Sequence, residues 1–130
     1  MPQQCILLVD DDEDDCDFLK ESLIEVGVML PIVVAYDGPT AFSVLEGLNG
    51  NLPKLIILDV NMPLMDGLTF YTKLKSTYNI PVIFYTTSCD DDLVKKATGL
   101  GVIDCVKKGV TYADNLSFAR RVFDFVRIGT

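Results

Sequence analysis

The sequence contains no histidine among its 130 residues, and it contains no tryptophan. Without histidine, the chain cannot build Ser-His-Asp triads, histidine metal sites or phosphohistidine. No apolar run reaches the roughly 20 residues of a membrane-spanning helix, and no basic segment followed by an apolar one opens the chain. We therefore expect a cytoplasmic protein whose chemistry rests on carboxylates, hydroxyls and lysines.

Positive charge is also scarce, because 11 lysine and arginine residues face 19 aspartate and glutamate residues and leave a formal net charge of -8. A chain this acidic is repelled by phosphate backbones and by anionic lipid headgroups. We expect neither nucleic acid nor a membrane as a partner.

Cysteine occurs four times but never in C-x-x-C spacing. Two of the four, Cys5 and Cys105, fall in strand-like apolar runs, where cysteine behaves as a small apolar residue. We interpret all four residues, Cys5, Cys16, Cys89 and Cys105, as reduced thiols of the core.

Short apolar runs alternate with segments of helical periodicity five times along the chain, and 49% apolar residues are enough for the core of one domain. The apolar runs predict strands at residues 5–9, 32–36, 55–58, 82–85 and 103–106. The periodic segments predict helices at residues 16–26 and 39–48, over about ten residues from 68, at 91–100, and through 116–126. This alternation is typical of an α/β protein, a flavodoxin-like doubly wound (βα)5 fold with a parallel five-stranded sheet in the order 2-1-3-4-5.

Two pairs of residues have the spacing of a capping box, in which the first residue precedes a helix and the fourth lies in its first turn. These pairs are Ser88 with Asp91 and Thr111 with Asp114. We expect Ser88 and Thr111 to begin the last two helices.

Polar residues directly follow four of the predicted strands. Asp10 and Asp11 end the first strand, and Asp59 ends the third. In the order 2-1-3-4-5 these strands are neighbours about 4.8 Å apart, so their carboxylates face one cleft. Thr86 and Lys108 end the fourth and fifth strands at the same edge of the sheet.

Each of these residues also has a purely structural interpretation. Asp59 could cap the turn after it through its own backbone, as aspartate often does. Thr86 could simply end a strand, and Lys108 could be a solvated loop lysine. The acidic residues at 12–15 fit a solvated first turn of a helix, where the helix dipole favours negative charge.

Three carboxylates in one cleft repel each other unless a cation neutralises them. Ligands made only of oxygen indicate a hard cation, and an open site that keeps several waters suits Mg²⁺. An EF-hand is excluded, because neither acidic stretch has the alternating ligands, central glycine and terminal glutamate of that loop. With Mg²⁺ in place, Asp59 is a candidate nucleophile for a phosphoryl group, and Thr86 and Lys108 are candidate partners of that group.

Taken together, these motifs resemble the receiver domain of two-component response regulators over nearly the whole chain. They are Asp10-Asp11, Asp59-Val60-Asn61-Met62-Pro63, Asp66-Gly67, Thr86 and Lys108. The resemblance implies that a histidine kinase or a phosphotransfer protein phosphorylates Asp59 and that the chain turns over no separate metabolite. It further implies that Asp11, Asp59 and the backbone carbonyl of Asn61 bind Mg²⁺, with Asp10 acting through water, and that Thr86 and Lys108 sense the phosphoryl group.

The same resemblance predicts the organisation of the protein and its output. We expect residues 1–130 to form a single receiver domain without an output domain. The tripeptides Asn-Met-Pro and Thr-Thr-Ser are similar to the corresponding motifs of stand-alone receivers of the phytochrome-associated type. Output is expected through protein contacts of the face made by helix 4, strand 5 and helix 5, with a homodimer as one expected assembly. That face would offer Lys95, Lys96, Arg120 and Arg121 beside Phe118 and Phe125.

Three positions depart from the family pattern. Gly109 follows the lysine where proline, often with a cis bond, is usual, so we expect a looser or differently shaped loop. Cys105 replaces the aromatic switch residue of strand 5, and helix 4 or Tyr85 is expected to carry the change in its place. Thr87 replaces a commonly smaller residue and is expected to narrow the approach of water to an acyl phosphate.

One enzyme class remains as an alternative. A haloacid-dehalogenase-like Mg²⁺-dependent phosphatase or phosphotransferase would also use Asp59 as its nucleophile. That class requires a second aspartate two residues later as acid and base, and Asn61 stands there.

Overall fold

The computed structural model describes residues 4–128, in which five parallel strands form one sheet. The strands are β1 (Ile6–Val9), β2 (Ile32–Ala35), β3 (Leu55–Leu58), β4 (Val82–Thr86) and β5 (Asp104–Lys107). Their order is β2-β1-β3-β4-β5, which confirms the predicted doubly wound topology. Strands β1, β3 and β4 are buried along their whole length, as their continuous apolar sequences predict for a sheet covered on both faces.

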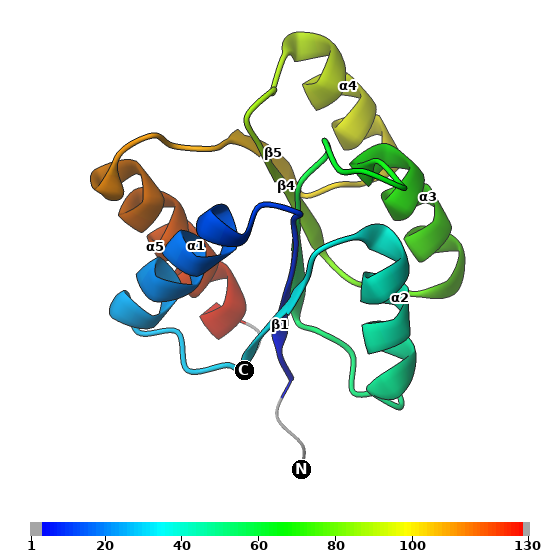
Figure 1. The fold of residues 1–130 in the computed structure, drawn as a ribbon, viewed down its shortest axis with the longest axis horizontal. Coiled ribbons are helices and arrows are strands. Elements are labelled where there is room, and N and C mark those ends of the chain that lie inside the picture. The colour runs from blue at the N-terminus through cyan, green and yellow to red at the C-terminus, as the bar shows by residue number, and fades with distance from the viewer. Residues whose placement is uncertain (1–3, 129–130) are drawn as a thin grey trace.

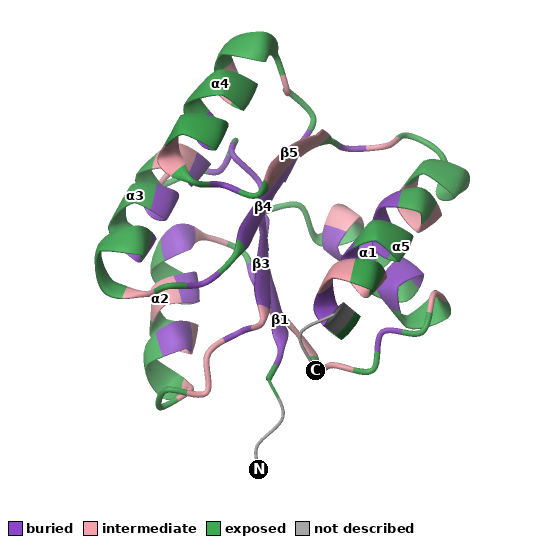
Figure 2. Ribbon diagram, turned by 180° about the vertical axis from the view of Figure 1, so that it is seen from behind, coloured by how far each residue is buried: buried purple, intermediate pink, exposed green. Residues whose placement is uncertain are grey.

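Five helices cover the sheet in two layers, with α1 and α5 on one face and α2, α3 and α4 on the other (Figure 1). The helices are α1 (Glu13–Glu25), α2 (Gly38–Gly47), α3 (Gly67–Thr77), α4 (Asp91–Leu100) and α5 (Tyr112–Ile128). Successive strand residues point to opposite faces, so Leu7 and Val9 pack toward α2, α3 and α4, whereas Ile6 and Leu8 pack toward α1 and α5. Figure 2 shows the result, since the helices are buried on the side toward the sheet and exposed on the other.

Aspartate caps the first turn of four helices. The side chains of Asp12, Asp37, Asp66 and Asp90 each accept a hydrogen bond from the backbone N–H three residues later. The expected cap at Ser88 is therefore wrong, because α4 begins at Asp91 and its N-cap position falls on Asp90. The second expected capping box is confirmed, since Asp114 N–H donates to Thr111 Oγ1 and Thr111 N–H donates to Asp114 Oδ2.

Most element boundaries lie within a residue or two of the sequence prediction. Helix α1 begins at Glu13, ahead of its apolar stripe, because the acidic residues after Asp12 form its first turn, as the sequence suggested. Strand β5 begins one residue late, at Asp104, and includes Lys107, because these polar residues pair with Ile83 and Thr86 of β4. Polar residues suit this strand, because it lies at the edge of the sheet.

The strand register brings the polar strand ends together. Val9 pairs with Leu58, so Asp10 and Asp59 are the next residues of neighbouring strands, and Asp59 N–H donates to the Val9 carbonyl at 2.9 Å. On the other side of β3, Lys108 N–H donates to the Thr86 carbonyl at 2.8 Å. The carboxyl ends of β1, β3, β4 and β5 therefore form one continuous edge, where ligands bind in open α/β sheets.

The four cysteines are free thiols, as predicted. Cys5 and Cys16 are buried, whereas Cys89 and Cys105 are half-buried. Cys105 packs against the core from the edge strand, but the expectation of a core position is wrong for Cys89, which lies in the loop before α4. Within residues 4–128, no helix combines the length and the apolar character that a bilayer crossing requires.

Candidate functional site

Lys108 lies at the centre of the polar strand ends. Its Nζ is 2.6 Å from Asp10 Oδ2, 2.7 Å from Asp15 Oδ2 and 3.2 Å from Asp59 Oδ2. Asp10, Asp59 and Lys108 are all buried. The structure therefore brings the predicted Asp10, Asp59 and Lys108 into one ion cluster and adds Asp15 to it.

Asp15 was not predicted as a site residue, because the sequence analysis assigned residues 12–15 to a solvated helical turn. Its position on α1 explains the contact: Asp15 precedes the core residue Leu19 by four residues, so both lie on the inward face of the helix. The four-residue spacing between Asp15 and Leu19 is the feature of the sequence that could have predicted this contact. The other acidic residues of the run, Glu13 and Asp14, are exposed as expected.

The ionisation of the cluster reflects competition between burial and pairing. Burial lowers the pKa of Lys108, but hydrogen bonds to Asp10 and Asp15 outweigh it, so this pKa lies above its ordinary value. Burial raises the pKa of Asp10 to about 6, although Lys108 and the Asp12 N–H favour its charged form. Lys108 therefore stays charged, while desolvation outweighs the ion pair at Asp10.

A cation could bind between the acidic strand ends. Asp10, Asp11 and Asp59 each offer one carboxylate oxygen, and these three oxygens lie within 4.8 Å of one another. Asp11 is exposed and the other two are buried, so the oxygens sit at the boundary between the core and solvent. A donor set made only of oxygen fits a hard divalent cation.

This boundary opens into a cavity of about 480 Å³, lined by Asp11, Asp12, Glu13, Asp14, Asp15, Asp59, Asn61, Thr87 and Lys108. The Asn61 N–H donates to Asp59 Oδ1 at 3.2 Å, which holds the carboxylate of Asp59 in place. Thr87 is exposed at the rim. The cavity gives a solvent-borne group direct access to Asp59.

Thr86 lies beside this cavity but does not line it. Its side chain is fully buried, and within the described part of the chain its Oγ1 has no hydrogen-bond partner. A buried hydroxyl without a partner costs about 1–3 kcal/mol. Such a cost is readily explained at a site where the hydroxyl gains a partner when a ligand binds.

Residues 6–118 match the response regulator receiver domain family. The chain belongs to this family. Its relatives include protein-glutamate methylesterase/protein-glutamine glutaminase 1 of Methanosarcina mazei, which is 30% identical over 117 residues, covering 88% of this chain and 33% of that protein. This receiver therefore spans about a third of the length of that enzyme.

Two similar solved structures are response regulators. The crystal structure of the phosphorylated cyanobacterial phytochrome response regulator RcpA has a TM-score of 0.86 and 26% identity to this receiver, covering 99% of this chain and 97% of that one. The Mn²⁺-bound form of response regulator Rcp1 has a TM-score of 0.82 and 28% identity, covering 95% of this chain and 94% of that one. The match confirms the family expected from the sequence and does not favour the phosphatase alternative.

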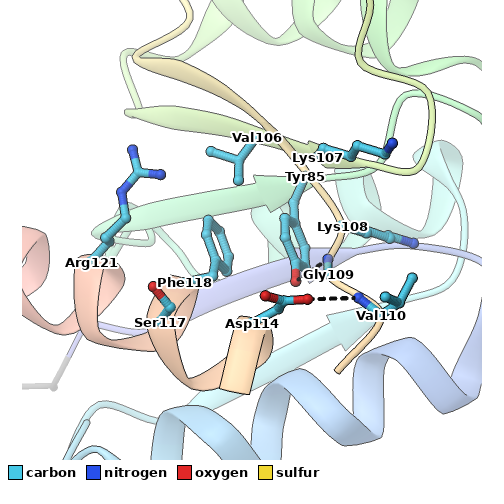
Figure 3. Close-up of a pocket in the computed structure, with 10 residues that line it drawn as sticks. All are labelled: Tyr85, Val106, Lys107, Lys108, Gly109, Val110, Asp114, Ser117, Phe118 and Arg121. Carbon is cyan, nitrogen blue, oxygen red and sulfur yellow. Dashed lines mark hydrogen bonds between the residues drawn. The ribbon is translucent and has the colours of Figure 1, made fainter. Parts of the chain in front are cut away.

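Tyr85, which was expected with helix 4 to replace the family's aromatic switch, lies on the α5 side of the sheet. Its ring stacks on Phe118, with 4.0 Å between ring centroids and 2° between ring planes. Its hydroxyl donates to Asn115 Oδ1 at 3.0 Å and accepts from Gly109 N–H at 3.4 Å. Figure 3 shows the two rings side by side, with the Gly109 bond drawn. Tyr85 therefore connects β4 to α5 and to the loop after Lys108.

These rings border a cavity of about 400 Å³ lined by Tyr85, Val106, Lys107, Lys108, Gly109, Val110, Asp114, Ser117, Phe118 and Arg121 (Figure 3). The expectation that Phe118 lies on an exposed docking face is wrong, because Phe118 is buried against Tyr85. Phe125 is half-buried against the same core. Arg121 is exposed and forms an ion pair with Asp104 of β5. Phe118 therefore adds no exposed apolar side chain to this side of the receiver.

The loop at Gly109 is closely packed, which contradicts the expectation of a looser loop but not that of a differently shaped one. A Cβ built on Gly109 would lie 2.2 Å from the Cβ of Asp114, so only glycine lets the first turn of α5 approach this closely. Asp114 Oδ2 accepts from the N–H group of Val110 (Figure 3) and from that of Thr111, and these two bonds close the loop. No cis peptide bond occurs among the described residues. Close contact between Gly109 and α5 therefore holds this loop, in place of the rigid proline that is usual in the family.

Proposed function

We propose that this receiver accepts a phosphoryl group on Asp59 with the help of Mg²⁺ and passes the signal on through protein contacts. One observation carries the proposal: the buried Asp59 carboxylate lies beside Lys108 and within 4.8 Å of oxygens of Asp10 and Asp11, at the mouth of a cavity. A nucleophilic carboxylate next to a fixed cation and an oxygen-only metal site matches the needs of phosphoryl transfer.

In the proposed reaction, a carboxylate oxygen of Asp59 attacks the phosphorus of a phosphohistidine on a histidine kinase or phosphotransfer protein. The new O–P bond forms as the P–N bond breaks, and the leaving imidazole keeps the electron pair. Asp11, Asp59 and the Asn61 carbonyl would hold Mg²⁺, with Asp10 acting through water. When bound, Mg²⁺ would neutralise negative charge on the phosphoryl oxygens. Lys108 supplies a second positive charge, already 3.2 Å from Asp59 Oδ2.

The two remaining predicted residues read the phosphoryl group. Thr86 Oγ1 gains the acceptor that it lacks within the described chain when it turns toward a phosphoryl oxygen. Lys108 exchanges part of its contact with Asp10 and Asp15 for the phosphoryl group. Thr86 is the last residue of β4, and Lys108 directly follows β5. A movement of these two residues therefore reaches the face made by α4, β5 and α5.

That face is where we place the output partners. Lys95, Lys96 and Arg120 are exposed on α4 and α5. A kinase, a target protein or a second copy of the chain, as a homodimer, would dock there. We further propose that residues 1–130 act as one receiver domain in the cytoplasm, that the protein turns over no separate metabolite, and that it binds neither nucleic acid nor membranes. A phytochrome-type kinase is the partner suggested by the likeness to RcpA.

The test uses a small acyl phosphate with Mg²⁺ as the donor and intact-mass analysis as the readout. The wild type should gain one phosphoryl group, and Asp59→Asn should gain none because an amide is not a nucleophile here. Asp14→Asn is the matched control, since Asp14 is an exposed acid lining the same cavity. An adduct that persists in Asp59→Asn would assign the phosphoryl group to another residue.

The same preparation separates the enzyme alternative. A haloacid-dehalogenase-like phosphatase would release many equivalents of free phosphate from a phosphate monoester. This receiver should release none above the uncatalysed rate, because no second carboxylate stands two residues after Asp59 to activate water.

A further inference from the structure

Two cysteines meet between β4 and β5, at the side of the receiver where the phosphoryl signal is expected to leave. Cys89 lies in the loop between β4 and α4, and Cys105 lies on β5. Their Sγ atoms are 3.1 Å apart, and Cys89 Sγ donates to the Cys105 carbonyl at 3.4 Å. Both residues are half-buried, so the pair is in contact with solvent.

We propose that Cys89 and Cys105 form a reversible disulfide when the protein meets hydrogen peroxide. A disulfide has an S–S distance of about 2.05 Å, so the two sulfurs need to approach by about 1 Å. That movement is small for a residue in a loop and a residue on an edge strand. The remaining described thiols have different surroundings, because Cys5 is buried and Cys16 is buried with its Sγ donating to the Asp10 carbonyl.

The oxidation balances with the peroxide as the only co-reactant. The Cys89 thiolate attacks one peroxide oxygen, the O–O bond breaks, and Cys89 becomes a sulfenic acid while hydroxide leaves. The Cys105 sulfur then attacks the Cys89 sulfur, and the sulfenic oxygen leaves as water with the Cys105 proton. Two thiols lose two electrons and two protons, and the peroxide becomes two waters.

The order of attack follows from the environment of Cys105. Burial raises the pKa of the Cys105 thiol to about 12, and the neighbouring Cys89 adds to the rise. Cys105 therefore remains protonated at neutral pH and acts as the resolving thiol. In a reducing compartment the pair would rest as two thiols and oxidise only transiently.

The disulfide would join two segments that the proposed function requires to move, and this consequence rests on that function. Cys89 follows Thr86 by three residues, and Cys105 lies on β5, the strand that pairs with Thr86 through Lys107. A covalent bond between them fixes the loop after Thr86 to β5. Oxidation would then leave Asp59 open to phosphorylation but suppress the structural response of α4 and β5.

The first experiment tests the disulfide without any phosphoryl donor. The reduced protein is treated with hydrogen peroxide, unfolded, alkylated and weighed, then digested with trypsin, which cuts after Lys95 and Lys96 between the two cysteines. We expect two alkylated thiols in place of four and a linked species of residues 76–95 and 97–107. Cys89→Ser and Cys105→Ser should each prevent that species. Four alkylated thiols, or a linkage to Cys5 or Cys16, would overturn the proposal.

The second experiment tests the consequence. Oxidised and reduced protein are treated with a small acyl phosphate and Mg²⁺, and the adduct and the amide exchange of α4 and β5 are measured. We expect equal adduct in both forms, and a change in exchange only in the reduced form. Cys89→Ser should keep that change after peroxide treatment. A change of equal size in oxidised wild type would overturn the regulatory role, whereas failure of the adduct in both forms would count against the proposed function and leave the disulfide result standing.

Discussion

Lys108 illustrates how one side chain can serve both the fold and the chemistry. A lysine at a strand end contributes little packing by itself, and the sequence implied for Lys108 only a role in sensing the phosphoryl group. In the structure its ammonium group lies within 3.2 Å of three carboxylates, two of them buried. Removing it leaves the carboxylates to repel each other.

We therefore expect Lys108→Ala to lower the free energy of unfolding without added cation, by about 3 kcal/mol. This is the low end of the cost of breaking a buried ion pair, because Asp59 and Asp15 border an open cavity. Urea unfolding followed by circular dichroism measures the change. Lys107→Ala is the matched control, since Lys107 is exposed and should change stability by less than about 0.5 kcal/mol. Equal stability of the two variants would show that the cluster does not hold the fold.

At the scale of elements, the loop between β5 and α5 depends on the contact between Gly109 and the capping box of α5. The pKa of the Asp114 carboxyl is lowered chiefly by the Thr111 hydroxyl. The hydrogen bonds that Asp114 accepts from the N–H groups of Thr111 and Val110 lower this pKa further. A carboxyl whose pKa is lower in the folded state than in the unfolded chain stabilises the fold above the unfolded pKa. That contribution is lost as the pH falls through the folded pKa.

Asp114→Asn should consequently lower the melting temperature at pH 7, and the difference from wild type should shrink as the pH falls from about 4 toward 2. Thermal melts at a series of pH values measure this difference. The charge of Asp114 also favours the first turn of α5 through the helix dipole, which acts in the same direction. A difference that is the same at pH 2 and pH 7 would mean that the side chain acts through its shape and not through its charge.

At the scale of the whole molecule, the chain carries a net charge of -8, and the carboxylates of Asp10, Asp11 and Asp59 converge at one edge of the sheet. Like charges this close oppose folding unless a cation binds them. A cation that binds the folded site and not the unfolded chain stabilises by RT ln(1 + [L]/Kd), which is about 1.4 kcal/mol at tenfold excess over Kd.

Mg²⁺ at that excess should raise the melting temperature by roughly 4 to 6 °C for a domain of this size. Asp11→Ala should be as stable as wild type or more stable without Mg²⁺, because it loses a repelling charge, and its response to Mg²⁺ should nearly vanish. Asp14→Ala is the matched control and should keep the full response, because Asp14 is exposed and lies outside the oxygen cluster. Scanning calorimetry with and without Mg²⁺ measures the shifts.

A second control replaces Mg²⁺ with a monovalent salt at equal ionic strength, since screening alone stabilises a protein this acidic. The specific site requires a larger rise with Mg²⁺ than with that salt. An equal rise, or an Asp11→Ala variant that responds like wild type, would contradict a carboxylate metal site.

Local sequence patterns were enough to predict the sheet, the order of its strands and the meeting of Asp10, Asp11 and Asp59 at one edge. This was possible because apolar runs and helical stripes are local patterns, and because parallel strands of known order bring their carboxyl ends together. The helix starts were predictable to within a few residues for the same reason. Ser88 failed as a cap because capping-box spacing does not decide between neighbouring polar residues, and Asp90 occupies the N-cap position.

Only the tertiary structure decided which side chains meet across the chain. Asp15 contacts Lys108, which lies 93 residues away in the sequence, and Cys89 contacts Cys105, which lies 16 residues away. Phe118 is buried and stacks on Tyr85. Such contacts depend on the rotation of each helix against the sheet and on the path of each loop. A residue's own neighbours in sequence set the face on which it lies, whereas the packing of distant elements sets what that face touches.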